Sequence, residues 1–152
     1  MLIKVAKTSD LETVYRIVQQ TIHAVYFHYY AKGAVEFFLE HHSQENIAAD
    51  IRSGTVFLCI NAEETAVGTM TLKRNELCRL FVLPEYQNKG YGGALIDFAE
   101  AQIFKEYDRV VLDASLPAKR MYRNRGYREI ESDIIKANHG DYLCYDRMCK
   151  SR

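Results

Sequence analysis

The chain has 152 residues, of which 48% are apolar and 26% are charged, and this length suits a single domain over residues 1–152. Lysine plus arginine and aspartate plus glutamate number 20 each, which excludes a nucleic-acid or membrane partner held by bulk charge. No apolar run is long enough to span a membrane, the first residues show no secretion signal, and the four cysteines form no CxxC pair. We therefore expect a cytoplasmic protein with no metal site.

The first third of the chain predicts one strand followed by helices. Residues Ser9–Glu12 (SDLE) form a capping box, and apolar residues follow at helical spacing from 11 to 25. The aromatic segment 26–42 is broken at Lys32-Gly33, which predicts two helices joined by a hinge. A strand over 2–6 comes before these helices, and a helix over 44–52 comes after them.

The rest of the chain alternates strands and helices. A hairpin leads into a βαβ unit, and a strand pair closes the chain, so the element order predicts an α/β fold. Gly126 is placed to end the last helix. We expect strands over 55–60, 66–73, 76–83, 109–112, 127–136 and 142–150, and helices over 92–106 and 117–125.

A glycine-dense turn lies where the strand over 76–83 gives way to a helix. Gly90, Gly92 and Gly93 fall within seven residues, although a simple reversal needs one glycine at most. A helix N-terminus presents free amides and attracts phosphate, and glycine lets the backbone come close to a ligand. The turn therefore predicts a diphosphate-binding site.

The turn does not match either of two common nucleotide-binding motifs. It has no G-K-S/T ending of a nucleotide P-loop. The turn also lacks the third glycine of the dinucleotide-binding fingerprint. Asp113 does end a strand about 20 residues further on, where that fingerprint has an acidic residue for the ribose. A turn that only tightens a strand–helix junction is the remaining alternative.

Two ordered motifs carry a family resemblance. Residues 80–95 (LFVLPEYQNKGYGGAL) resemble the acyl-CoA-binding signature of the GNAT N-acetyltransferase superfamily, a strand L-x-V-x-P followed by Q/R-x-x-G-x-G-A/G. Ala118, Tyr122 and Gly126-Tyr127 then match the family pattern A-x-x-x-Y-x-x-x-G-F/Y. The resemblance covers residues 2–150 and implies the GNAT fold, a mixed central sheet of about seven strands flanked by helices.

The resemblance also implies the cosubstrate. Family members hold the pyrophosphate of acetyl-CoA on the loop amides and its pantetheine arm on the strand backbone, without a metal. Ser115 stands where many members carry asparagine, which changes that detailed contact. The residues expected to bind the cosubstrate are Leu80, Phe81, Val82, Gln87, Asn88, Lys89, Gly90, Tyr91, Gly92, Gly93, Ser115 and Tyr122.

The same resemblance suggests catalytic residues. Tyr122 matches the tyrosine that protonates the departing thiolate, and Val82 matches the donor of the N–H that stabilises the developing oxyanion. Glu76 lies eleven residues before Gln87, the separation of a catalytic glutamate in histone-type members. Ordered water, His23 or His28 are alternative bases, and a solvated strand end accounts for Glu76 equally well.

The aromatic segment 26–38 lies where family members build the acceptor pocket, and its rings suit a cation–π contact with an amine. We expect transfer of an acetyl group to a primary amine of a small molecule or peptide, by direct attack in a ternary complex. A non-catalytic acyl-CoA-binding module or partner subunit is the alternative. The final strand often pairs between subunits in this family, so a homodimer is possible.

Overall fold

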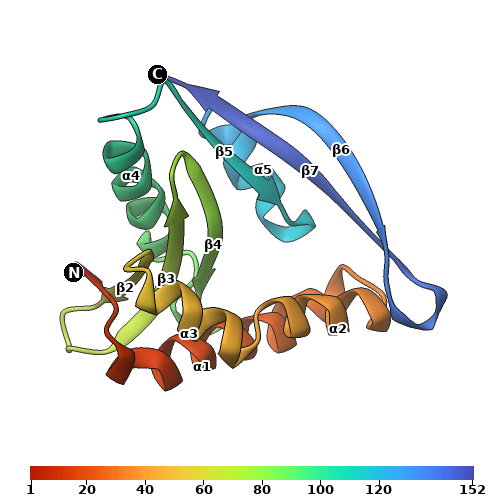
Figure 1. Ribbon diagram of the computed structural model, residues 1–152, viewed down its shortest axis with the longest axis horizontal. Coiled ribbons are helices and arrows are strands. Elements are labelled where there is room, and N and C mark those ends of the chain that lie inside the picture. Colours follow the sequence, from red (N-terminus) through yellow and green to blue (C-terminus); the bar gives the residue numbers. More distant parts are fainter.

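The computed structural model describes residues 1–152 and contains one seven-stranded mixed sheet, in the order β1-β2-β3-β4-β5-β7-β6 (Figure 1). All neighbours pair antiparallel except β4 and β5, which are parallel. This sheet confirms the predicted α/β fold and its seven strands. The strands are β1 (Leu2–Val5), β2 (Val56–Ile60), β3 (Ala66–Lys73), β4 (Glu76–Val82), β5 (Arg109–Ala114), β6 (Arg128–Lys136) and β7 (Tyr142–Ser151).

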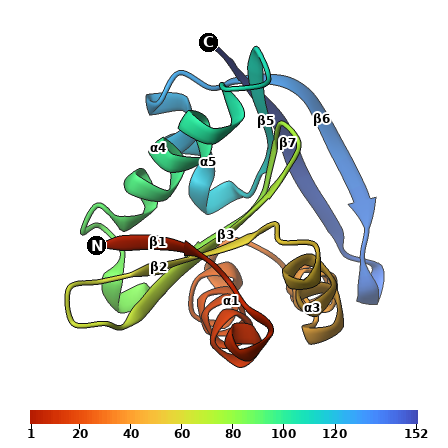
Figure 2. The ribbon, with the colours of Figure 1, turned by 60° about the vertical axis from the view of Figure 1, so that its left-hand side comes forward.

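Helices cover both faces of the sheet (Figure 2). One hydrophobic cluster joins the sheet to α1, α2 and α3, and a second joins it to α4 and α5. No helix has the length and apolarity that a membrane crossing requires. The helices are α1 (Leu11–Val25), α2 (Lys32–His41), α3 (Gln44–Arg52), α4 (Tyr91–Ile103) and α5 (Leu116–Asn124).

Helix α1 is held by its apolar stripe. Val14, Ile17, Val18 and Ile22 recur at helical spacing, and all four are fully buried against the sheet. Each buried side chain of this size contributes about 1.5–3 kcal/mol relative to an exposed one. The stripe thus fixes the helix that supports the end of β4.

Two local predictions in this region are wrong. Ser9 does not cap α1, because residues 8–10 form a 3-10 turn in which the Lys7 N–H donates to the Asp10 carboxylate at 2.9 Å, and α1 begins only at Leu11. The chain also does not break at Lys32-Gly33, since both residues belong to the first turn of α2. The break lies just before them, where Ala31 is extended and caps α2.

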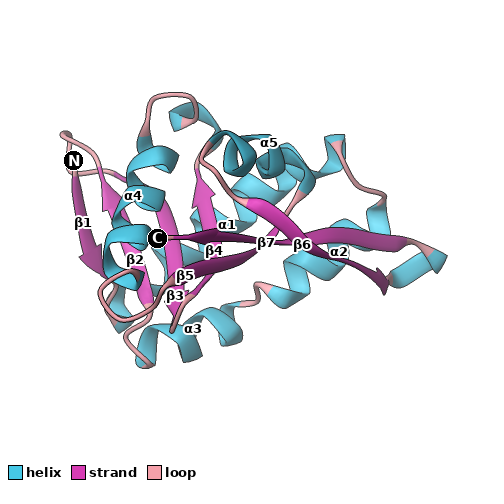
Figure 3. Cartoon of the chain, turned by 90° about the horizontal axis from the view of Figure 1, so that it is seen from above, coloured by secondary structure: helices cyan, strands magenta, loops and turns pink.

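Gly33 has a packing reason instead. A Cβ at this position would lie 2.0 Å from the backbone oxygen of Asn138, in the turn between β6 and β7. The Gly33 N–H donates to the Asp141 carboxylate at 2.8 Å in the same turn. The long β6–β7 hairpin therefore reaches across the molecule and rests on the start of α2 (Figures 1 and 3).

Strands β4 and β5 separate soon after they meet. Their only paired residues are Glu76 and Val111, and the Val111 N–H donates to the Asn75 carbonyl at 2.9 Å. Beyond this point β5 continues beside β7 while β4 continues beside β3. The strands diverge toward the carboxyl end of β4, and that edge of β4 has no strand partner.

Candidate active site

Two adjoining cavities lie where β4 and β5 diverge. We call the first the loop cavity, of about 300 Å³, because the turn before α4 lines it through Gln87, Asn88 and Gly92. We call the second the hairpin cavity, of about 200 Å³, because it extends to Ile135, Leu143 and Tyr145 of the β6–β7 hairpin. The residues that line both cavities are Tyr26, Leu80, Phe81, Ser115 and Ala118.

The turn before α4 presents free backbone amides. Gly90 has a φ of 90° and caps the helix, a conformation that favours glycine. The first helical hydrogen bond runs from the Ala94 N–H to the Gly90 carbonyl, so the amides of Tyr91, Gly92 and Gly93 have no acceptor within the helix. These amides stand at the positive end of α4, where an anion is stabilised.

Gly92 and Gly93 are not required by the packing of the chain itself. A Cβ on Gly92 would lie 3.9 Å from Val82, and one on Gly93 would lie 3.7 Å from Arg125, both ordinary contact distances. Gly92 nevertheless lines the loop cavity. The bare backbone there fits a ligand that must approach the amides closely, as a diphosphate does.

Two polar side chains of the turn, those of Gln87 and Lys89, contact other residues of the chain. The Gln87 side-chain amide donates to the Val82 carbonyl at 2.9 Å and so ties the turn to the end of β4. The Lys89 ammonium lies 5.3 Å from the centre of the Tyr86 ring, a cation–π distance. Asn88 has a φ of 58°, which helps to reverse the chain.

The free edge of β4 faces the cavities. The Leu83 N–H donates to the Val67 carbonyl of β3 at 2.9 Å. Backbone groups alternate in direction along a strand, so the amides of Leu80 and Val82 point to the opposite edge, toward β5. This edge offers hydrogen-bond donors to an extended ligand lying between the strands.

Tyr122 stands on α5 in the wall of the hairpin cavity. It is 5% exposed, and burial, with a smaller effect of Tyr26, raises its pKa far above the usual range. Its ring packs edge-on against Tyr127 at 5.5 Å between ring centres. The phenol therefore stays protonated at neutral pH, so it carries a proton that it can donate.

Glu76 lines neither cavity and lies at the point where β4 and β5 meet. Its carboxylate is 3.4 Å from the Arg147 guanidinium, which also binds Asp113 at 2.9 Å. His23 and His28 are exposed and line neither cavity. The structure therefore brings Tyr122 and the strand edge together, but it does not bring the predicted bases to them.

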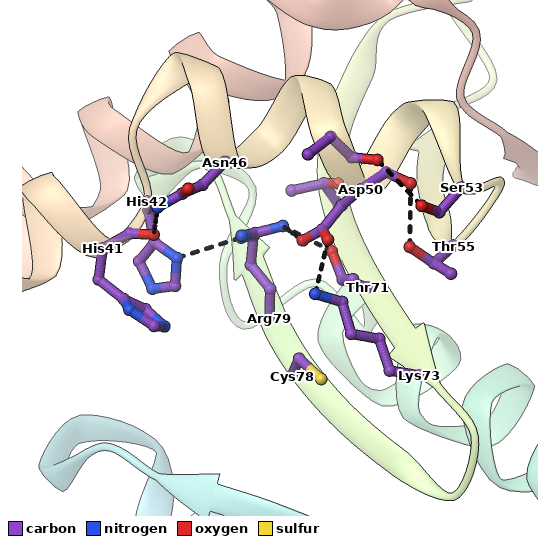
Figure 4. A network of polar contacts seen from close by, with 12 residues as sticks. His41, His42, Asn46, Asp50, Ser53, Thr55, Thr71, Lys73, Cys78 and Arg79 are labelled. Carbon is purple, nitrogen blue, oxygen red and sulfur yellow. Dashed lines mark hydrogen bonds and ion pairs between the residues drawn. The ribbon is translucent and has the colours of Figure 1, made fainter.

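A polar cluster beside the hairpin cavity was missed by sequence reasoning (Figure 4). Arg79 is 6% exposed, and its Nη1 donates to Asp50 at 3.1 Å and to Thr71 at 2.8 Å. Its Nε donates to Nδ1 of His42 at 3.1 Å, and Lys73 lies 2.5 Å from Asp50. The available signal was an arginine in the middle of the apolar strand ELCRLFV, since a buried charge requires partners.

Both histidines at the end of α2 line this cavity and have lowered pKa values. Burial, together with the nearby charge of Arg79, holds the pKa of His42 well below its ordinary 6.5. Burial, followed by the charges of Arg79 and Lys73, also lowers the pKa of His41. Both imidazoles are therefore neutral at pH 7, and the Phe37 ring stacks on His41 at 5.8 Å.

Comparison with known proteins places the chain in a family. Residues 21–142 match the model of the acetyltransferase (GNAT) domain. The chain belongs to the GNAT acetyltransferase family. This membership supports acetyl transfer in general, and it agrees with the two motifs that surround the cavities.

Individual relatives of this GNAT chain agree. An uncharacterized N-acetyltransferase of Chlorobaculum tepidum is 31% identical over 104 residues, which are 68% of this chain and 62% of that protein. A GCN5-related N-acetyltransferase structure from Rhodopseudomonas palustris superposes with a TM-score of 0.89 at 22% identity, covering 99% and 95% of the two chains. The PaiA N-acetyltransferase of Thermoplasma acidophilum, solved with coenzyme A, has a TM-score of 0.70 at 22% identity, covering 99% and 98%. These structural matches confirm the GNAT fold.

Proposed function

We propose that this protein is an acetyl-CoA-dependent N-acetyltransferase that acetylates a primary amine of a small molecule or peptide by direct attack in a ternary complex. One observation carries the proposal. The free amides of α4 and the unpaired edge of β4 surround the loop cavity, and the adjoining hairpin cavity holds Tyr122. A donor and an acceptor can therefore meet at the residues that line both cavities.

Different groups of the chain suit different parts of the donor, acetyl-CoA. Amides of Tyr91, Gly92 and Gly93 suit the pyrophosphate, with Asn88 and Lys89 beside them, and the β4 edge from Leu80 to Val82 suits the pantetheine arm. Bound acetyl-CoA supplies the acetyl group as a thioester. The coenzyme A in the PaiA structure supports this choice of ligand. Ser115 lines both cavities, where its hydroxyl can donate or accept a hydrogen bond.

Acetyl transfer then needs a balanced exchange of protons. The amine nitrogen forms the new C–N bond as the C–S bond breaks, and the amine proton passes to a base. The Val82 N–H stabilises negative charge on the carbonyl oxygen, and the Tyr122 hydroxyl gives its proton to the departing sulfur. Holding the two substrates side by side supplies much of the remaining acceleration.

For the base that takes the amine proton, the structure offers a candidate that the sequence did not indicate. Glu76 stays a prediction. Two observations disfavour it, since its carboxylate is paired with Arg147 and it does not line the hairpin cavity. His41 is a second candidate, favoured because it lines the cavity and its lowered pKa keeps the imidazole neutral at pH 7.

Titration calorimetry with acetyl-CoA, coenzyme A and NAD tests the donor site. We expect about one molecule of acetyl-CoA or coenzyme A per chain and no binding of NAD. A screen of primary amines, with release of coenzyme A as the signal, then tests transfer. Absence of acetyl-CoA binding at millimolar concentration would overturn the proposal.

The alternative is a module that binds acyl-CoA without turnover. It predicts acetyl-CoA binding with no release of coenzyme A for any amine, which the same screen detects. A homodimer also stays a prediction. Strand β7 is paired on both sides, by β5 and β6, so β6 is the sheet edge at which a second subunit can add a strand.

A further inference from the structure

We propose that the hairpin cavity contains a carboxylate-binding subsite formed by Arg79 and His42, so that the acceptor is a small molecule carrying both an amine and a carboxylate. This inference rests on the proposed function and specifies its substrate class. Four features of the cavity support it: an unused donor on each residue, the charge of the cluster, the charge across the cavity, and the cavity size.

Some N–H donors of the Arg79 guanidinium have no partner within the chain. A guanidinium carries five N–H groups, and three are directed at His42, Asp50 and Thr71 through Nε and Nη1. Nη2 donates to no group of the chain, although the side chain is buried and lines the hairpin cavity. Nη2 is not among the fully buried atoms that lack a partner, so a water or a ligand can reach it and accept its hydrogen bond.

His42 is held in a single tautomer. Its Nδ1 accepts the hydrogen bond from Arg79, so the ring proton of the neutral imidazole lies on Nε2. Nε2 has no partner within the chain, and the ring is 6% exposed in the cavity wall. Arg79 therefore both offers a donor and turns His42 into a second one.

The charges of the cluster favour an anion. Arg79 and Lys73 share one carboxylate, that of Asp50, which leaves one positive charge without a counter-ion. The guanidinium of Arg79 is buried and poorly screened, whereas the Lys73 side chain is 48% exposed and is screened by solvent. A carboxylate in the cavity can accept a charge-assisted hydrogen bond from either free donor, and bonds of this kind are the strong ones.

The β5 side of the cavity has the opposite sign. Asp113 lines the cavity, and it shares the single Arg147 guanidinium with Glu76, so this group keeps one negative charge. An ammonium group is attracted there while a carboxylate is attracted to the β4 side. The two walls together match a zwitterion.

The size of the hairpin cavity and the residues that line it narrow the class of acceptor further. A cavity of about 200 Å³ suits a molecule of amino-acid size. Phe37, Phe38 and Tyr145 line it and suit an apolar or aromatic side chain. We therefore infer an amino acid or a close analogue with an apolar side chain, rather than a polyamine or a peptide N-terminus, which lacks the nearby carboxylate.

A binding experiment tests the subsite without catalysis. The protein with saturating coenzyme A is titrated with 3-phenylpropionate and, as the matched control, with its neutral amide. We expect the acid to bind more than about tenfold more tightly, because a hydrogen bond to a charged group is lost in the amide. Equal binding of the acid and the amide, or no binding of either, would overturn the subsite.

A kinetic experiment uses three acceptors that differ only at the carboxylate: phenylalanine, phenylalaninamide and 2-phenylethylamine. We expect kcat/KM for coenzyme A release to be more than about tenfold higher for phenylalanine than for the other two. Equal or higher values for the two amines without a carboxylate would overturn the substrate class. Tight binding of 3-phenylpropionate with no turnover of any acceptor would instead count against the proposed function alone.

Variants connect the preference to the named residues. Arg79→Gln is made together with Asp50→Asn, since removing one partner alone would leave a buried charge unpaired. His42→Phe keeps the ring and removes the Nε2 donor. In each variant that melts cooperatively and binds acetyl-CoA, we expect the preference for carboxylate to fall by about tenfold, mainly through KM. An unchanged preference in both would show that other groups bind the carboxylate.

Discussion

The backbone N–H of Leu116 donates a hydrogen bond of 2.6 Å to the hydroxyl oxygen of Tyr30, although 86 residues separate them in sequence. This bond joins the aromatic segment before α2 to the first turn of α5, the helix that carries Tyr122. Ser115, the N-cap of α5, makes no side-chain capping bond, so Tyr30 takes over that role from a distant part of the chain.

Replacing Tyr30 with phenylalanine removes this acceptor. We expect a loss of about 1 kcal/mol in the free energy of unfolding, as for a lost helix cap, together with a lower kcat because Tyr122 is less well held. Urea unfolding and steady-state kinetics measure both effects. Tyr29→Phe is the matched control, since Tyr29 is 52% exposed and makes no side-chain hydrogen bond. Equal losses in both variants would contradict the capping role.

Tyr122→Phe tests the proton donor. Removing the hydroxyl should lower kcat by about 10²–10⁴-fold, the usual effect of general acid catalysis, and leave acetyl-CoA affinity nearly unchanged. Single-turnover kinetics and calorimetry separate the two quantities. Tyr127→Phe, on the neighbouring ring, is the control. A parent-like kcat in Tyr122→Phe would remove this residue from the mechanism.

Gly92→Ala separates ligand binding from folding. Because the added methyl group meets Val82 and Met121 only at 3.9 and 4.0 Å, we expect stability to be unchanged or slightly increased. Affinity for acetyl-CoA should fall, since the methyl group enters the loop cavity. Gly33→Ala should show the reverse, because its methyl group collides with the backbone of Asn138. Thermal melting and calorimetry of the two variants check this opposite pattern.

His42 makes stability depend on pH. Its pKa is lowered in the folded state because of burial, so above the ordinary value of 6.5 it is neutral in both states and its contribution is fully present. As the pH falls below 6.5 the unfolded chain takes up a proton that the folded chain refuses, and the free energy of unfolding decreases. His42→Asn, which keeps an acceptor for Arg79, should flatten this slope below pH 6.5 in denaturant titrations. The lowered pKa of His41 leaves a smaller slope of the same sign.

The pH dependence of kcat/KM distinguishes the candidate bases. If His41 accepts the amine proton, activity should decline on the acid side below 6.5, where the imidazole becomes charged. His41→Gln should then lower kcat/KM by about 10²-fold or more and remove that limb of the profile. Glu76→Gln is the comparison. If the acid limb of the profile remains in His41→Gln and disappears in Glu76→Gln, the base is Glu76.

Much of the donor side could be predicted from local sequence. The glycine turn, the free helix N-terminus and Tyr122 depend on residues close together in the chain, and the apolar periodicity that places α4 and β4 is local as well. Element order was sufficient for the α/β class and the seven strands. The role of Tyr122 as an acid stays a prediction.

The proposed acceptor side depends on contacts between distant residues. Arg79 meets Asp50 and His42 across 29 and 37 positions, and Arg147 meets Glu76 across 71. No spacing rule indicates which buried arginine will contact which carboxylate, so the sequence suggested Glu76 either as a base or as a solvated strand end and did not indicate His41 as a base. The capping box at Ser9 was wrong for a related reason, since the preceding 3-10 turn had already used the local amides.

The two cavities are lined by largely separate stretches of this chain. Apart from the five residues shared by both cavities, the hairpin cavity is lined by the end of α2, the first half of β4, the β6–β7 hairpin, Asp113 and Tyr122, while the glycine turn lines only the loop cavity. If the loop cavity holds the acyl donor as we propose, changes in residues 37–42 or in the hairpin can alter which amine is accepted without disturbing the groups that hold the donor. Under this proposal the fold allows new acceptor preferences to evolve, or to be engineered, on an unchanged donor site.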